Sequence, residues 1–262
     1  MNSPVLYAVD DGVATITFNR PDAMNSLDTA TKVALREHVL DAAADAEVRA
    51  VVLTGSGRAF CVGQDLKEHA DSLAEDDADL GATVQDHYSP VAFSLATMNK
   101  PVIAAVNGVA AGAGAAFAFA CDVRIMSDTA GYNLAFAAIG LSCDSGSSWT
   151  LPRLVGWARA RELLLLPRTV RADEALALGL ATEVVPADTV LARAGEIARQ
   201  LAAGPTLAYG AIRQALAFSA ANGLAESLAN EGDLMRFTGS TEDHRAAVTA
   251  FLAKQTPEFH AR

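Results

Sequence analysis

The spacing of apolar side chains near the start of the chain predicts two paired strands followed by a helix. The β-rich run Val13–Phe18 follows the apolar run Leu6–Val9 through an Asp-Gly dipeptide, which is typical of a tight hairpin turn. Downstream, apolar residues recur every three or four positions, as they do on one face of a helix. Asp28 can cap this helix, which we expect to end near Asp45.

Two short apolar runs farther along the chain predict buried strands of a parallel sheet. These are Arg49–Thr54 and Pro101–Val106, and each ends in turn residues. The second run leads into Gly112–Ala120, a helix of small residues whose backbone can pack closely against a neighbour or a ligand. Cys121–Met126 is expected as the next strand, so strands and helices alternate through this half of the chain.

From residue 157 onward the pattern is helical, apart from a short strand-like run at Thr182–Val185. A chain of 262 residues can hold one main domain with an appendage. We therefore expect an α/β fold, with a layered core over residues 1–200 and a helical region over residues 201–262. The expected helices are Ala158–Leu166, Ala172–Leu178, Asp188–Ala202, Pro205–Ala220, Gly223–Phe237 and Thr241–Lys254.

Composition narrows the classes of partner. Hydrophobic residues make up 51% of the chain, which is enough for a large core. The net charge of −11 and the pI near 4.8 argue against binding to nucleic acid or to an anionic membrane surface. Residues 68–86 hold no Lys or Arg, and their acidic side chains predict a solvated, mobile loop. These acids are Glu68, Asp71, Glu75, Asp76, Asp77, Asp79 and Asp86.

The cysteines and the N-terminus indicate a compartment. Cys61, Cys121 and Cys143 form no CxxC pair, and an odd number cannot close a disulfide framework. The first residues lack the pattern of a signal peptide, and the longest apolar stretches, such as Val109–Cys121, are too short and glycine-broken to cross a bilayer. We expect a cytoplasmic protein that binds no metal and no membrane.

Familiar catalytic motifs are missing or incomplete. Gly112–Phe117 lacks the last glycine of a dinucleotide-binding loop, no Walker lysine occurs, and Asp144–Ser148 lacks the elbow of a serine hydrolase. Two backbone segments, residues 59–65 and 107–114, follow directly on predicted strands. Helix starts and glycine turns can point peptide N–H groups at a developing oxyanion, although such turns are more often plain packing devices.

Together these segments carry a more specific pattern. FCVGQDL is followed by KPVIAAVNGVAAGAG, then by ACD and by IGLSCDSGSSWTLPRLVG. The combination resembles the crotonase superfamily, also called the enoyl-CoA hydratase/isomerase family, over almost the whole chain. The resemblance implies a crotonase-like β/α spiral core that binds a coenzyme A thioester as substrate. It also implies no permanently bound cofactor, and a C-terminal helical region that builds a homotrimer or homohexamer.

The resemblance assigns roles to individual residues. Family members use two peptide N–H groups to polarise the thioester carbonyl, and the matching donors are Val62 and Ala113, with Gly112 and Gly114 as alternatives to Ala113. Trp149 and Trp157 are expected in the core near the crevice, and Asp122 is expected to fix a turn. The coenzyme A path implied by the resemblance runs along Ala23, Gln64, Asp65, Leu66, Lys67, Gly112, Phe251 and Lys254, although a solvated surface charge is equally natural for the two lysines.

The chain departs from the family pattern where the chemistry is decided. Hydratases of the family deliver water through two glutamates, and those positions here are Ala116 and Phe136. An acid stands instead at Asp144, where hydratases carry glycine. An isolated Asp before Ser-Gly-Ser-Ser is most simply a helix N-cap, but in this motif the resemblance implies a catalytic carboxyl. Ala116 and Phe136, with Trp149, would line a dry substrate pocket and raise the pKa of that carboxyl.

Two branches of the family carry an aspartate at this position, the ring-1,2-epoxyphenylacetyl-CoA isomerases and the 4-chlorobenzoyl-CoA dehalogenases. The first use it to move a proton between carbons, and the second use it as a nucleophile. The dehalogenases also have a tryptophan where this chain has Phe136, and a histidine near Ser89, two residues from His87. We therefore expect an acyl-CoA isomerase that works through Asp144. The alternatives are an enoyl-CoA hydratase, a dehalogenase-like hydrolase and a non-catalytic CoA-binding scaffold.

Overall fold

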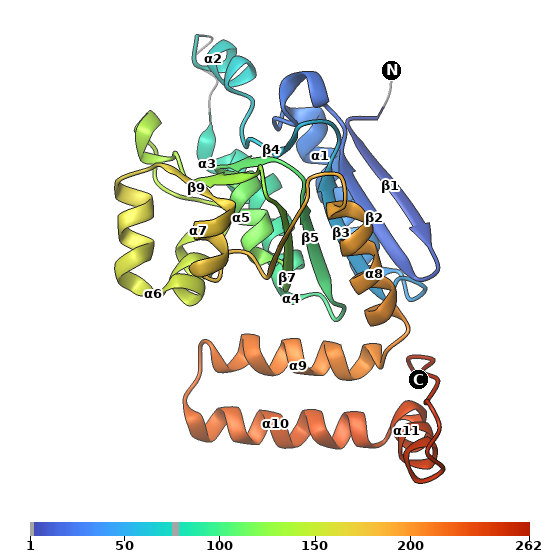
Figure 1. Cartoon of the computed structure of the whole chain (residues 1–262). Helices are drawn as coiled ribbons and strands as arrows, with labels where there is room; N and C mark the ends of the chain where they lie inside the picture. Colours follow the sequence, from blue (N-terminus) through green and yellow to red (C-terminus); the bar gives the residue numbers. More distant parts are fainter. Residues whose placement is uncertain (1–2, 75–78) are drawn as a thin grey trace.

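The computed structural model describes residues 3–74 and 79–262 and contains a large mixed sheet (Figure 1). Its strands lie in the order β1-β2-β3-β5-β7-β10, with β1 antiparallel to β2 and all the other pairs parallel. The predicted hairpin is confirmed. Its turn residues have positive φ angles of 46° at Asp11 and 74° at Gly12, as a tight hairpin turn requires. The strands are β1 (Val5–Asp10), β2 (Val13–Phe18), β3 (Ala50–Gly55), β5 (Val102–Val106), β7 (Val123–Ser127) and β10 (Glu183–Val185).

A second, smaller sheet was not predicted. It has the order β4-β6-β8-β9, and its strands are only three residues long, which is too short for a period of two to show in the sequence. A strand of the large sheet is followed each time by one of the small sheet, from β3 to β4, from β5 to β6 and from β7 to β8. This repeat winds the chain into a spiral. The strands are β4 (Ala59–Cys61), β6 (Val109–Ala111), β8 (Gly131–Asn133) and β9 (Thr169–Arg171).

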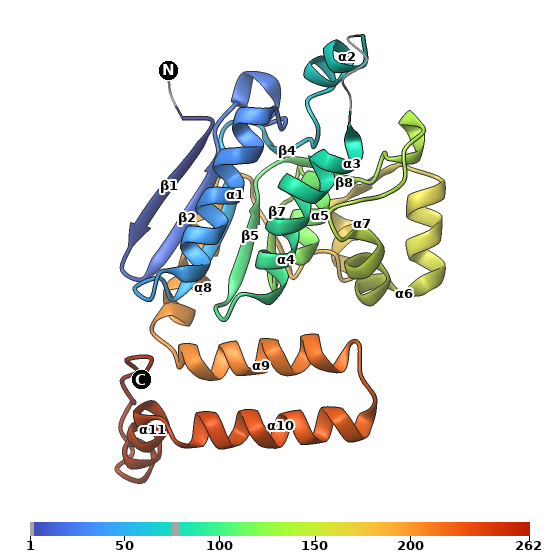
Figure 2. The ribbon, with the colours of Figure 1, turned by 180° about the vertical axis from the view of Figure 1, so that it is seen from behind.

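Helices cover both faces of the large sheet. On one face α1 (Thr29–Ala44), α4 (Ser89–Thr97) and α5 (Ala113–Ala120) lie over a core that includes Leu53 and Phe117 (Figure 2). On the other face α8 (Val190–Ala202) packs its alanines against alternate residues of the strands, such as Val52. Asp28 caps α1 as predicted, since its carboxylate accepts the Thr31 N–H at 2.8 Å.

The acidic segment is helical where the structure describes it, so the loop predicted there is wrong. It forms α2 (Leu66–Ala74), α3 (Leu80–Thr83) and the π-helical turn η2 (Val84–Tyr88), while Glu75, Asp76 and Asp77 lie outside the described residues. Two of its acids bind partners that lie elsewhere in the chain or on nearby backbone. Glu68 pairs with Lys32 at 3.4 Å and accepts the Thr29 N–H, and Asp79 caps α3. Charge counting within the segment could not show these partners.

Two further helices and two short 3₁₀ turns complete the core. α6 (Ser147–Leu165) changes direction at Gly156, whose φ is 75°, so the predicted helix from residue 158 is only its second half. Trp157 follows that break and is 67% exposed, which corrects its expected place in the core. The remaining elements are η1 (Pro21–Ala23), η3 (Ala137–Ile139) and α7 (Ala172–Ala177). None of the described helices is long and apolar enough to span a membrane.

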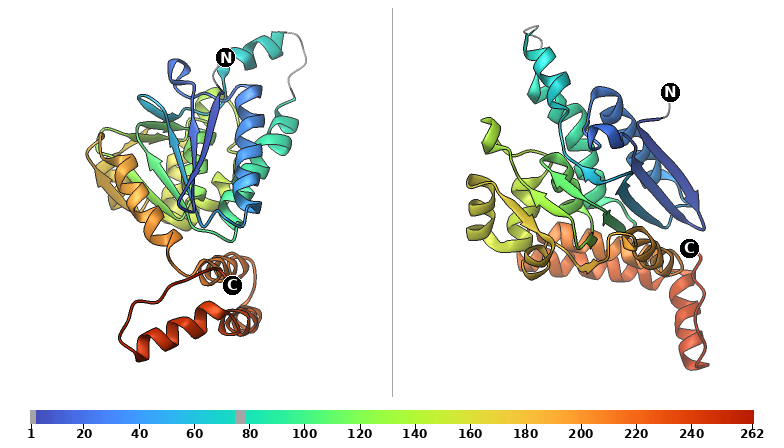
Figure 3. Two further views of the ribbon diagram at one scale, coloured as in Figure 1. Left: turned by 90° about the vertical axis from the view of Figure 1, so that its right-hand side faces the viewer. Right: turned by 45° about the horizontal axis from the view of Figure 1, so that its top comes forward.

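The last third of the chain ends in an arm of three helices, α9 (Thr206–Ser219), α10 (Leu224–Gly239) and α11 (Glu242–Leu252). The first two form a hairpin below the core, and α11 turns away from them (Figure 3). The predicted helices of this region are confirmed. The arm leaves large apolar side chains exposed, namely Ile212, Leu216, Leu224, Leu228, Met235 and Phe251.

Two buried or half-buried arginines fasten the arm to the core. Arg213 on α9 pairs with Asp122 at 2.7 Å and donates to the backbone carbonyls of Leu95 and Lys100. Asp122 also accepts the Val102 N–H, so it fixes a turn as expected. Arg49, at the start of β3, donates to Thr206 and to the carbonyls of Gly204 and Phe259, and so joins the start of α9 to the C-terminal tail.

Replacing Arg213 by Met is expected to destabilise the docked arm. The guanidinium is 8% exposed, and its loss leaves a carboxylate and two carbonyls without their donor, which should lower the free energy of unfolding by about 2–4 kcal/mol. The matched control is Arg236→Met, because Arg236 is 77% exposed and pairs with Asp233 on the surface of α10. Urea denaturation should separate the two variants, and equal effects would contradict the anchoring role of Arg213.

Candidate active site

The two backbone segments singled out in the sequence lie in contact. Cys61 on β4 pairs with Ala110 on β6. A Cβ atom built on Gly63 would lie 2.9 Å from the Ala111 oxygen and 3.3 Å from the Ala113 nitrogen. The φ of Gly63 is 82°, so both the space and the backbone conformation require glycine there. The peptide units of Val62 and Ala113 therefore lie at one place, where β4 ends and α5 begins.

The structure distinguishes among the three candidate donors of the second segment. The N–H of Gly112 donates to the Asn133 backbone oxygen at 3.0 Å, so it is not free to donate to a substrate oxyanion. Ala113 is the first residue of α5, where an N–H has no acceptor within the helix. Gly114 rests against the β4 backbone, since a Cβ on it would lie 2.1 Å from the Cys61 oxygen. Gly112 is thus excluded, and Ala113 is favoured because its nitrogen lies 3.3 Å from the place of a Cβ on Gly63, next to the Val62 peptide, while Gly114 stays an alternative.

Asp144 lies on the loop between η3 and α6 and does not cap the helix. The cap position of α6 is Gly146, which makes no side-chain cap bond. The half-buried Asp144 carboxylate accepts a hydrogen bond from the Ser145 hydroxyl at 2.8 Å. The capping interpretation, the simplest one for an isolated aspartate, is therefore wrong for this residue.

The surroundings of Asp144 favour its neutral form. Burial raises the pKa of its carboxyl above the ordinary value, and the Ser145 hydrogen bond opposes this effect in part. The direction agrees with the expectation from the sequence. Tyr88 on η2 lies close enough that the negative charge of Asp144 adds to burial in raising the pKa of the phenol. A carboxyl with a raised pKa is suited both to take up and to return a proton.

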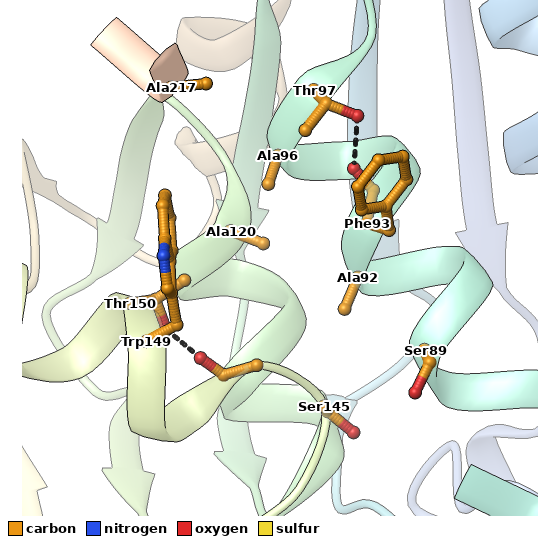
Figure 4. Close-up of a pocket in the computed structure, with 11 residues that line it drawn as sticks. Ser89, Ala92, Phe93, Ala96, Thr97, Ala120, Ser145, Trp149, Thr150 and Ala217 are labelled. Carbon is orange, nitrogen blue, oxygen red and sulfur yellow. Dashed lines mark hydrogen bonds between the residues drawn. The ribbon is translucent and has the colours of Figure 1, made fainter. Parts of the chain in front are cut away.

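An apolar cavity of about 510 Å³ lies beside the Asp144 turn (Figure 4). Trp149 and Phe93 stand on its two sides, and small side chains from α4, α5 and α9 line the space between them. Trp149 lines this cavity and is 43% exposed, so it is not a core residue. The cavity residues are Ser89, Ala92, Phe93, Ala96, Thr97, Ala120, Ser145, Gly146, Trp149, Thr150 and Ala217.

Ala116 and Phe136, the other two predicted pocket residues, do not line this cavity. Ala116 is fully buried inside α5. The Phe136 ring lies next to Gly112, with its Cε1 atom 3.9 Å from the place of a Cβ there. Phe136 therefore covers the start of α5, close to the Ala113 N–H.

The residues expected along the coenzyme A path near the core occupy one region. Ala23 ends η1, and Leu66 and Lys67 are exposed at the start of α2. Gln64 accepts a hydrogen bond from the Tyr88 hydroxyl. This contact links Gln64, two residues after Val62, to Tyr88, which lies close to Asp144. Nothing in the sequence indicated this contact.

Asp65 is engaged in an ion pair. Its carboxylate accepts hydrogen bonds from Arg20 and from Ser26, each at 2.9 Å. Burial alone would raise the pKa of Asp65, but these hydrogen bonds and the Arg20 charge outweigh it and hold the pKa below the usual value. The side chain thus ties the residues just before α2 to the residues that flank η1, which leaves only its backbone for a ligand.

Phe251 and Lys254 lie apart from the rest. Both are exposed, at the end of α11, on the far side of the arm from α2 (Figure 1). One chain therefore does not bring them together with Lys67.

Within residues 3–74 and 79–262, no three His, Cys, Asp or Glu side chains gather as metal ligands.

Comparison with known proteins identifies the class. The family model for enoyl-CoA hydratase/isomerase matches residues 8–262. The chain is 41% identical over 255 residues to the 1,2-epoxyphenylacetyl-CoA isomerase of Escherichia coli K12, covering 97% of each protein. It is 35% identical over 260 residues to the 2,3-dehydroadipyl-CoA hydratase of the same strain, covering 99% of this chain and 100% of that one.

A solved structure agrees with these matches. A crystal structure assigned as an enoyl-CoA hydratase/isomerase from Mycobacterium abscessus superposes with a TM-score of 0.95 at 42% identity, covering 98% of this chain and 100% of that one. The chain therefore belongs to the enoyl-CoA hydratase/isomerase family, whose members act on coenzyme A thioesters. This confirms the expected crotonase-like spiral core and the expectation that the protein is an enzyme of this family.

Proposed function

We propose that this enzyme is an acyl-CoA isomerase in which Asp144 is the single proton carrier. The observation that carries the proposal is the place of Asp144, a half-buried carboxyl beside an apolar cavity, in a chain with Ala116 and Phe136 where hydratases have their glutamates. The raised pKa of Asp144 supports this role, since a carboxyl that both accepts and donates must not be a very weak base.

The chemistry follows from these groups. The N–H groups of Val62 and Ala113 hold the thioester oxygen, so electrons can move onto it when a C–H bond breaks. Asp144 takes the proton from the carbon α or γ to the carbonyl. The enolate then collapses, and the same carboxyl returns the proton to a different carbon. No atom is gained or lost, and the step requires neither added water nor a resident cofactor.

The cavity supports a ring-bearing acyl group. Trp149 and Phe93 flank a space of about 510 Å³ whose other walls are small residues, namely alanine, serine, threonine and glycine, which leaves room for a ring between two aromatic side chains. The relative at 41% identity is named for 1,2-epoxyphenylacetyl-CoA. We propose an epoxyphenylacetyl-type thioester, or a ring-bearing enoyl thioester, as the substrate.

Oligomerisation would explain the separated residues of the coenzyme A path. Phe251 and Lys254 are exposed at the end of the same three-helix arm whose other helices expose Leu216 and Met235. We propose that the arm packs against other copies in a homotrimer or homohexamer. In that assembly Phe251 and Lys254 would contribute to the coenzyme A site of a neighbour. The substrate class and the free thiols of Cys61, Cys121 and Cys143 favour the cytoplasm.

Incubation with 2-enoyl-, 3-enoyl- and 4-chlorobenzoyl-CoA in heavy water tests the proposal. Isomerisation should give deuterium uptake and a shifted double bond with no added water, which mass spectrometry of the products detects. Addition of water would identify a hydratase, and release of chloride a dehalogenase. Binding without turnover or exchange, with 1,2-epoxyphenylacetyl-CoA as well as with these three esters, would identify a scaffold. Each of these three outcomes would overturn the isomerase assignment.

The structure already disfavours the hydrolytic alternative. Ser89 lines the cavity near the position where the dehalogenases have a histidine. His87 is not among the cavity residues, and burial, with the charges of Arg36 and Lys32, lowers the pKa of its imidazole. The position that matches the histidine of the dehalogenases is therefore a serine, which would leave a nucleophilic aspartate without the base that those enzymes use to activate water.

A further inference from the structure

The Asp144 carboxylate is held from one side. Its Oδ1 atom accepts the hydroxyl of Ser145 at 2.8 Å, while Oδ2 has no hydrogen-bond donor among the side chains and peptide groups of residues 3–74 and 79–262. Ser145 is 2% exposed and lines the same cavity. The two carboxylate oxygens are therefore unequal before any substrate binds.

The backbone at Ser145 is unfavourable for serine. Its φ is 52°, in the left-handed region, and Gly146 follows with a φ of 79°. A non-glycine residue is strained in this region of backbone conformation, and glycine would avoid that strain. A strained non-glycine residue beside a candidate catalytic carboxyl indicates that its side chain has a use.

We propose that Ser145 is a positioning residue for Asp144. Its hydroxyl holds Oδ1 and fixes the carboxyl plane at the rim of the cavity, so that Oδ2 is the oxygen that takes up and returns the proton. The inference rests on the proposed function, because it assigns the moving proton to one atom of the carboxyl named there. The serine forms and breaks no bond to substrate and acts only through Asp144.

The electrostatics of the turn support this role. Among the described residues, the titratable side chain that faces Asp144 is Tyr88 on η2. Burial raises the pKa of its phenol and keeps it neutral. The charges of Cys61 and Glu68, which also lie near Tyr88, raise that pKa further. α4 and α5 present Ala92, Ala96 and Ala120 to the cavity, and α6 presents Trp149 and Thr150, so these helices add no charge to it. Apart from burial, the Ser145 hydroxyl is the main influence on the Asp144 pKa.

Two variants separate the hydroxyl from the backbone. Ser145→Ala removes the hydroxyl and keeps a Cβ in the left-handed region, while Ser145→Gly removes the hydroxyl and relieves the backbone. Without the donor, the charged form of Asp144 loses stabilisation and its pKa rises. The acidic limb of the kcat/KM profile should move to higher pH by about half to one pH unit in both variants. kcat should fall about three- to tenfold, with Kd for a coenzyme A ester unchanged. Ser148→Ala, an exposed serine of α6, is the matched control.

A second readout does not depend on turnover. In protein labelled with ¹³C at aspartate carboxyls, Asp144→Asn identifies the Asp144 resonance, and its titration should move to higher pH in both Ser145 variants. Equal titrations in the wild type and in both variants would overturn the positioning role. So would a change confined to only one variant, which would assign the effect to the backbone. If Asp144→Asn itself keeps full activity, the proposed function fails first, and Ser145 loses its assigned role with it.

Discussion

Replacing Asp144 by Asn should lower kcat by about 10²–10⁴-fold while the coenzyme A thioester still binds. The amide has nearly the same shape and can still accept the Ser145 hydrogen bond through its oxygen, but it cannot carry a proton between carbons. The Val62 and Ala113 N–H groups are backbone and remain. Steady-state kinetics with a 3-enoyl-CoA, and deuterium exchange into the substrate, measure the loss.

Loss of activity through unfolding can be distinguished from loss of chemistry. Burial raises the pKa of Asp144, so the folded state holds its proton to higher pH than the unfolded chain does. Stability therefore falls as pH rises through that range, and the ionised side chain destabilises the fold at neutral pH. Asp144→Asn should accordingly melt at the same temperature as the wild type or higher.

A surface acid supplies the control for this variant. Glu174 pairs with Arg168 on the outside of α7, so Glu174→Gln removes a negative charge without touching the cavity. It should keep wild-type kcat. Isomerisation that survives in Asp144→Asn at more than a tenth of the wild-type rate would falsify the single-carboxyl mechanism.

Replacing Ala113 by Pro should remove one donor to the thioester oxygen and lower kcat by about 10²–10³-fold. Ala113 is the first residue of α5, where proline fits the helix and no helical hydrogen bond is lost. The variant thus deletes an N–H while the helix continues. Single-turnover kinetics would show the effect on the chemical step rather than on product release.

Ala113→Gly is the matched control, because it keeps the N–H and removes only the Cβ. Its kcat should stay within a few fold of the wild type, and circular dichroism should show that α5 is intact in both variants. If proline and glycine lower kcat equally, the Ala113 N–H is not the donor, and Gly114 becomes the candidate of the second segment.

The sequence was sufficient for elements whose signals are local. The hairpin turn, the Asp28 cap and the apolar runs of β3 and β5 depend on a few neighbouring residues, and the structure has them where they were predicted. The prediction for the acidic segment was wrong because its partners, such as Lys32, lie far away in sequence. The strands of the small sheet were not predicted because three residues are too few to show an alternating pattern.

The candidate site divides in a similar way. Its motif residues can be named from sequence, since the positive φ of Gly63 and the close approach of β4 to Gly114 both require glycine. The Tyr88–Gln64 contact and the cavity depend on how four separate helices pack, including α9 from the arm. Likewise, no local pattern shows that Phe251 lies at the far end of that arm.

The glycines that bring β4 and α5 together determine how this enzyme would respond to saturation mutagenesis. The proposed donors are main-chain groups, so most substitutions of the Val62 or Ala113 side chain leave them in place. At Gly55, Gly108 and Gly114, by contrast, a Cβ would lie 2.1–2.3 Å from a backbone oxygen. A fitness map would therefore show strong intolerance at glycines that touch no substrate and mild effects at Val62, a half-buried residue whose proposed role needs only its main chain.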